Sequence, residues 1–137
     1  MLADANTAAP QNIRALQEAA RIRGAELVVR LVVLASPILH GRRLDIFERT
    51  AALRLPAIYQ SPEFAEEGGL IGYGPRLTRM FRQLARQLAK VLGGENVSKV
   101  PIEQPTTFEL AINLQAAKAI GFEEPPSLVL RADKVIE

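Results

Sequence analysis

Several residue types that build metal centres and catalytic sites are missing or scarce in this chain. It contains no cysteine and a single histidine, His40, which excludes disulfides, thiolate metal sites and multi-histidine metal centres within one chain. Tryptophan is also absent, and only 5% of the residues are aromatic. We therefore expect a core built from aliphatic side chains, with no metal and no cofactor.

Long apolar segments are missing as well. The longest apolar run, Leu31 to Ala35, is far shorter than the roughly 20 residues that a helix needs to cross a bilayer. The first residues, Met1 to Pro10, are rich in alanine but lack the basic start and the apolar stretch of a signal peptide. As written, the sequence predicts a chain without an export signal, which would stay in the cytoplasm.

What is present is the balance of a folded domain. The 137 residues are 48% hydrophobic and 23% charged, so we expect one domain spanning residues 1–137. The formal net charge is only +2, which is weak support for a nucleic-acid partner, and none is expected.

Strand and helix patterns alternate along the chain. Short apolar runs predict strands, and periodic apolar positions predict helices. The expected strands are at 26–34, 56–59, 70–73 and 108–114. The expected helices are at 11–23, at 37–54 with a weak point near Gly41, at a short segment from Ser61, at 75–92, at 115–120 and after Pro125-Pro126. This order predicts an α/β fold, a small parallel sheet flanked by helices.

The predicted helix over 75–92 has two contrasting faces. One face carries an apolar stripe, which consists of Leu77, Phe81, Leu84, Leu88 and Val91. The other is basic, with Arg76, Arg79, Arg82, Arg86 and Lys90. RNA, an anionic membrane or a partner protein could meet such a face, but we interpret it as a solvated surface because the net charge is small.

A glycine-rich segment, Gly72-Tyr73-Gly74-Pro75, lies between a predicted strand and this helix. It suggests a phosphate-binding loop, but it lacks the third glycine of a dinucleotide motif and the Gly-Lys-Ser/Thr of a nucleotide-binding loop. The alternative is that the glycines permit a tight turn. A nucleotide-dependent α/β enzyme remains an alternative function, although no catalytic residues can be named.

Open α/β sheets bind ligands at the carboxyl ends of their strands. Three loops should therefore line a ligand site: Ser36, Pro37 and Ile38; Tyr59, Gln60 and Ser61; Gly72, Tyr73 and Gly74. The tyrosine rings could stack on a flat or apolar ligand. In the alternative interpretation, Tyr59 packs in the core and the two serines cap helices.

The order of elements from Gly68 to Glu137 resembles the C-terminal part of ABC transporter substrate-binding proteins. The residues that carry the resemblance are the strand and glycine turn Gly-Gly-Leu-Ile-Gly-Tyr-Gly-Pro, the long helix, and the segment Pro-Ile-Glu-Gln-Pro-Thr-Thr-Phe-Glu-Leu-Ala-Ile-Asn-Leu. The branch that it resembles has the type I periplasmic-binding fold and includes aromatic amino-acid binders. The resemblance implies a periplasmic protein that binds a small organic solute, such as an amino acid, without catalysis and interacts with an ABC permease.

Such proteins have two lobes, and this chain is too short for both. The resemblance thus implies a truncated chain that corresponds to the C-terminal lobe, with 75–106 belonging to the missing lobe. The run at 26–34 leaves no room for a crossover, which indicates an internal deletion. A non-functional remnant is a further alternative. Without the other lobe, the stripe at Leu77, Phe81, Leu84 and Leu88 should pack on its own domain or form a homodimer.

Overall fold

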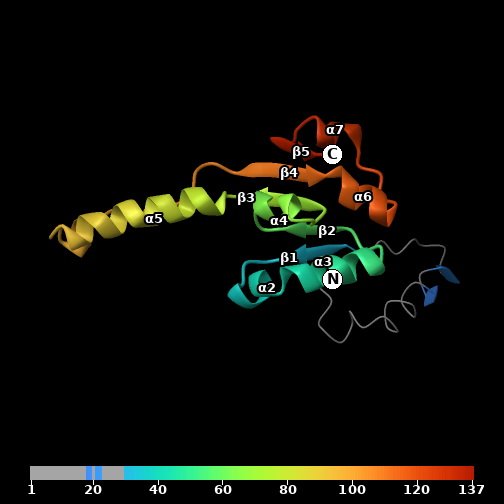
Figure 1. The fold of residues 1–137 in the computed structure, drawn as a ribbon, viewed down its shortest axis with the longest axis horizontal. Coiled ribbons are helices and arrows are strands. Elements are labelled where there is room, and N and C mark those ends of the chain that lie inside the picture. The colour runs from blue at the N-terminus through green and yellow to red at the C-terminus, as the bar shows by residue number, and fades with distance from the viewer. Residues whose placement is uncertain (1–17, 20, 23–29) are drawn as a thin grey trace.

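The computed structural model describes residues 18–19, 21–22 and 30–137 (Figure 1). The predicted strand at 26–29 lies outside these residues, and so does most of the predicted helix at 11–23.

Five strands form one sheet in the order in which they occur along the chain. They are β1 (Leu31–Val33), β2 (Ala57–Tyr59), β3 (Ile71–Gly74), β4 (Glu109–Asn113) and β5 (Lys134–Ile136). The pairs β1–β2, β2–β3 and β4–β5 are parallel, which confirms the predicted α/β fold. One pair departs from the predicted parallel sheet, because β4 runs antiparallel to β3. The chain leaves the sheet at the carboxyl end of β3 and returns beside that same end, so β4 must run in the direction opposite to β3.

The helices follow the predicted order with two differences. They are α2 (Pro37–Gly41), α3 (Arg43–Ala52), α4 (Pro62–Glu66), α5 (Leu77–Leu92), α6 (Leu114–Ile120) and α7 (Pro126–Val129). The helix expected over 37–54 is divided at Arg42, next to the weak point at Gly41. The helix expected after Pro125-Pro126 is a single turn, and β5, which the sequence did not predict, follows it.

The centre of the core is aromatic, so the expectation of an aliphatic core is incomplete. Tyr59 of β2 is 2% exposed, and its ring stacks on Phe64 of α4 with centroids 5.4 Å apart. Phe47 of α3 meets the Tyr59 ring edge-on at 5.1 Å. Val33 of β1 belongs to the same cluster. The helices α3 and α4 therefore cover one face of the sheet, and an aromatic contact joins them.

A second apolar cluster forms around α6. Leu70, just before β3, packs with Ala117 and Ile120 of α6, and Ile71 and Phe122 lie against them. Asn113 at the end of β4 connects α4 with the start of α6, because its side-chain amide donates to the Ala65 carbonyl at 2.9 Å and its Oδ1 accepts from the Ala116 amide at 2.9 Å.

The long helix α5 projects away from the sheet (Figure 1). None of its residues is buried. Phe81 is 65% exposed, Leu84 58% and Leu88 54%, so the apolar stripe does not pack on its own domain. Residues 101–108 lead back from the far end of α5 to the sheet, and the side chain of Gln87 on α5 donates a hydrogen bond to the Pro101 carbonyl of this segment. Within the described part of the chain, no helix is long and apolar enough to cross a membrane.

Candidate functional site

The structure brings the three predicted loops to one edge of the sheet. Ser36 follows β1, Gln60 follows β2 and Gly74 ends β3, and the parallel register places these carboxyl ends side by side. The antiparallel return adds the start of β4 to the same edge, because Gly74 pairs with Glu109. The edge therefore combines the predicted loops with a segment that the sequence argument did not include.

The loop after β1 is a helix cap with apolar neighbours. The hydroxyl of Ser36 accepts from the Leu39 amide at 3.5 Å and begins α2, as the capping interpretation predicted. Pro37 and Ile38 lie in the first turn of α2, and Ile38 is 74% exposed. This loop thus presents the apolar side chain of Ile38 at the edge, whereas the Ser36 hydroxyl is already bonded to the Leu39 amide.

The loop after β2 is mostly buried. Tyr59 belongs to the core, where its hydroxyl lies 3.4 Å from the Thr50 hydroxyl, and burial raises the pKa of Tyr59. The ring therefore has no free face for stacking, which agrees with the core interpretation. Ser61 is 1% exposed and occupies the N-cap position of α4, but its side chain makes no capping hydrogen bond. Gln60 is the half-buried residue of this loop.

The two glycines of β3 are required by close packing. A Cβ atom at Gly72 would lie 2.2 Å from the Ser61 carbonyl oxygen, and one at Gly74 would lie 2.0 Å from the Gln60 carbonyl oxygen. Both glycines are also paired with β4, Gly72 with Ala111 and Gly74 with Glu109. A backbone that is held in a sheet does not form the open cradle of amides that a phosphate-binding loop needs.

Tyr73 is the exposed aromatic residue of the edge. It is 52% exposed, and its ring centroid lies 6.0 Å from that of Phe108, which is equally exposed. Phe108 stands just before β4 and was not among the predicted site residues. Phe108 could have been noticed in the sequence because it begins the alternating run at 108–114. However, Phe108 comes close to Tyr73 only because β4 is antiparallel to β3.

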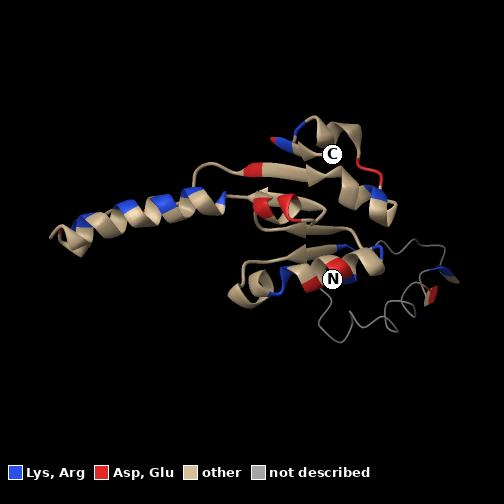
Figure 2. Ribbon diagram, in the orientation of Figure 1, with Lys and Arg blue, Asp and Glu red and all other residues tan. Residues whose placement is uncertain are grey.

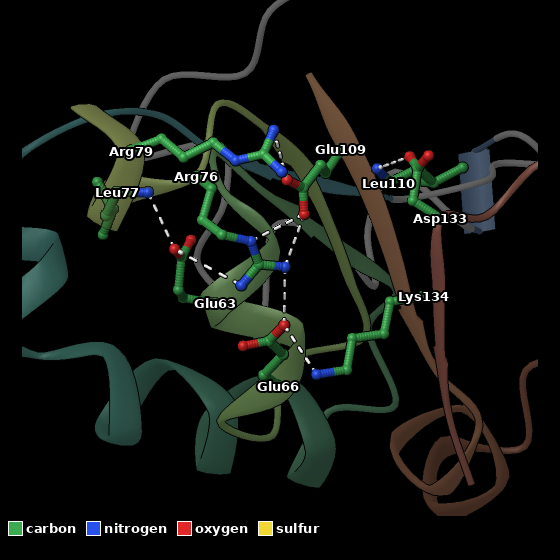
Figure 3. A network of polar contacts seen from close by, with 9 residues as sticks. All are labelled: Glu63, Glu66, Arg76, Leu77, Arg79, Glu109, Leu110, Asp133 and Lys134. Carbon is green, nitrogen blue, oxygen red and sulfur yellow. Dashed lines mark hydrogen bonds and ion pairs between the residues drawn. The ribbon is translucent and has the colours of Figure 1, made fainter. Parts of the chain in front are cut away.

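An ion cluster centred on Arg76 lies at the same end of the sheet (Figure 3). The Arg76 guanidinium contacts the Glu109 carboxylate at 2.7 Å and the Glu66 carboxylate at 3.0 Å, and Glu63 is 3.9 Å away. Hydrogen bonds with Glu109 and Glu66 raise the pKa of Arg76, so it stays charged. The hydrogen bond from Arg76 lowers the pKa of Glu66, and Lys134 lowers it further.

The cluster fixes the place where the chain leaves and re-enters the sheet. Arg76 precedes α5, Glu66 belongs to α4, Glu109 begins β4 and Lys134 begins β5. Glu63 adds a hydrogen bond from the Leu77 amide at 2.9 Å, which satisfies a free donor at the start of α5. Arg76, Arg79 and Lys134 thus neutralise the carboxylates of this cluster. Among the described residues, no group of three or more acidic or histidine side chains could hold a metal ion.

Comparisons with known proteins agree with this architecture. A family model described as ABC transporter substrate binding protein matches residues 23–136. The ABC domain of Streptococcus pneumoniae in complex with L-Trp aligns with a TM-score of 0.69 at 16% identity, over 92% of this chain and 50% of that one. A conserved domain protein of Vibrio cholerae aligns with a TM-score of 0.58 at 18% identity, over 90% of this chain and 50% of that one. The chain thus spans about half the length of these structures. Comparison with curated proteins finds no match.

Proposed function

This chain belongs to the family of ABC transporter substrate-binding proteins, and we propose that it supplies one of the two lobes of a solute-binding protein. The lobe would contribute one wall of a cleft and perform no catalysis. Support comes from the family match and from the fold, which corresponds to half of a two-lobe structure. A periplasmic location and an ABC permease as partner are parts of the same proposal.

The proposed solute site is the edge formed by the carboxyl ends of β1, β2 and β3. The observation that carries it is the exposed pair of rings at Tyr73 and Phe108. Exposed aromatic rings at the ligand-binding edge of an α/β sheet can stack on a flat solute. The Ile38 side chain and the half-buried Gln60 supply an apolar and a polar group from the neighbouring loops.

We propose that the solute is an aromatic amino acid. The similar structure from Streptococcus pneumoniae contains L-Trp, and an indole ring fits the size and chemistry of an aromatic pair. Tyr59 does not belong to the proposed contacts, because its ring is buried between sheet and helix. Gly72 and Gly74 take part only by holding Tyr73 at the edge.

The exposed stripe of α5 fits the same proposal. In a two-lobe protein the second lobe would cover Phe81, Leu84 and Leu88, which need an apolar partner. When the chain is alone, we propose that a second copy covers the stripe and that a homodimer forms through Leu77 and these three residues. A nucleotide-dependent enzyme is not favoured, because the Gly72–Gly74 backbone is paired in the sheet.

Titration with L-Trp tests the solute site. The chain has no tryptophan, so selective excitation of indole reports on the ligand alone. We expect weak, saturable binding in the roughly millimolar range, because one lobe covers only one side of the ligand. The double variant Y73A/F108A should abolish it. The variant F81A, which removes an even more exposed ring from α5, should not.

Two results would contradict the proposal. One is a change in indole fluorescence that Y73A/F108A leaves intact, which would place the ligand elsewhere. The other is submicromolar affinity of the isolated chain, which would show that a single lobe already forms a complete pocket.

A further inference from the structure

The basic face of α5 carries an excess of positive charge. The sequence from Leu77 to Leu92 contains Arg79, Arg82, Arg86 and Lys90 but no acid. In Figure 2 the ribbon of α5 is blue at these basic positions, which recur along the length of the helix. Like charges at spacings of three and four residues destabilise a helix. The arrangement therefore costs stability unless negative charge from elsewhere compensates for it.

Compensation within the described chain reaches only one end of this face. Arg79 contacts Glu109 at 3.3 Å, and Arg76 just before the helix contacts Glu109 and Glu66. None of the ion pairs among the described residues involves Arg82 or Arg86. The two guanidinium groups, four residues apart, are thus neighbours without a counterion.

A hollow lies beside these two arginines. Residues 105–107, returning along α5, enclose with the arginine face a cavity of about 320 Å³. Arg82, Arg86, Gln83, Thr106 and Thr107 supply polar groups to its lining. This volume is within the size range of small-molecule sites. The arginines offer only donors, and the threonine hydroxyls can donate as well.

We propose that this cavity binds a small oxyanion of the phosphate class, carried by an inorganic phosphate, a phosphate ester or a lipid headgroup. An anionic phosphate group, which is rich in acceptor oxygens, matches two guanidinium groups without an ion-pair partner among the described residues, because guanidinium groups bind phosphate oxygens in bidentate fashion. The cavity adjoins the Tyr73–Phe108 edge through Pro75 and Thr107, but neither ring lines it, and the proposal does not depend on the proposed solute. Its occupation would relieve the repulsion along α5.

Nuclear magnetic resonance of the arginine side-chain Nε–H groups tests the proposal on the whole chain. Titration with inorganic phosphate at constant ionic strength should shift the Arg82 and Arg86 signals saturably, while the signal of Arg49 on α3 stays in place. The double variant R82Q/R86Q should weaken phosphate binding at least about tenfold. Both side chains are exposed, so circular dichroism should show an unchanged fold.

A matched control separates a site from general attraction to a basic protein. The variant R49Q/K118Q removes the same amount of charge from exposed positions of α3 and α6 and should bind phosphate as the unmodified chain does. Equal weakening by both double variants would overturn the proposal. So would the absence of any saturable shift.

Vesicles of phosphatidylcholine with and without anionic phosphatidylglycerol distinguish the sources of the oxyanion. Binding to the anionic vesicles that free phosphate competes away would assign the site to a headgroup, whereas binding of phosphate alone would assign it to a soluble ligand. Vesicle binding that neither free phosphate nor R82Q/R86Q reduces would refute the cavity as the site.

Discussion

The close approach of β3 to the turn after β2 makes Gly72 a sensitive position for substitution. In Gly72→Ala the new Cβ would lie 2.2 Å from the Ser61 carbonyl oxygen, whereas ordinary contacts begin at 3.4 Å. It would also lie 2.9 Å from the Pro62 Cα, so it meets backbone in both cases. The Ser61 carbonyl cannot easily retreat, because it accepts from the Phe64 amide at 3.2 Å.

Relief of this clash requires the strand or the turn to move by about 1 Å, which disturbs the pairing of Gly72 with Tyr59 and Ala111. Overpacking of a core costs about 1–3 kcal/mol, and contact with backbone favours the upper end of that range. A loss of about 3 kcal/mol is a large part of the stability of a small domain and should lower the melting temperature by roughly 10 °C.

Urea unfolding followed by circular dichroism measures this loss. The matched control is Gly41→Ala at the end of α2, where a Cβ would meet no atom within 4 Å. That variant should be neutral or more stable by up to about 1 kcal/mol, because alanine favours a helix over glycine. If Gly72→Ala unfolds at the same urea concentration as Gly41→Ala, the packing role of Gly72 is refuted.

Three further predictions concern the edge, the ion cluster and α5. Tyr73→Ala should lower stability by less than about 1 kcal/mol, compared with about 3–5 kcal/mol for a buried aromatic residue, and a large drop in melting temperature would return Tyr73 to the core. Glu66→Gln should lower the stability by about 1 kcal/mol or less at neutral pH. Because the folded pKa of Glu66 lies below its usual 4.5, this loss of stability should vanish as the pH falls through the folded pKa. Urea unfolding across the acid range measures it, and a difference that stays constant with pH would contradict the reasoning. The double variant F81E/L84E should convert a dimer to a monomer in sedimentation equilibrium while the sheet stays folded, and an unmodified chain that is monomeric at high concentration would exclude the dimer.

The sequence predicted elements well where one period dominates a segment. The stripe of α5 repeats at three and four residues, and β2 and β3 coincide with short apolar runs, so these elements lie close to where they were expected. The direction of β4 could not be predicted, since it depends on which edge the chain returns to after α5. β5 was missed because Lys134–Ile136 begins with a lysine and contains only two consecutive apolar residues, too few to stand out as an apolar run.

The candidate site was predicted in outline but not in its side chains. Tyr59 and Tyr73 both stand near the carboxyl ends of strands, yet Tyr59 is buried and Tyr73 is exposed. Tyr59 is in register with Gly72, so Tyr73, one residue further on, points to the opposite face of the sheet. The sequence alone does not show which face the helices cover. The Arg76 cluster was likewise hidden, because its partners come from α4, β4 and β5.

The pairing of β3 with β4 has a consequence for how this domain can be divided. Because Tyr73 faces Leu110 and Gly74 faces Glu109, the two strands form a β-hairpin whose loop is the whole excursion of residues 75–108. None of the other three strands pairs with that loop. A chain in which a short turn replaced the excursion would retain every strand pairing of the sheet. The excursion is in this sense a detachable module, and the sheet is a minimal scaffold onto which other loops could be grafted.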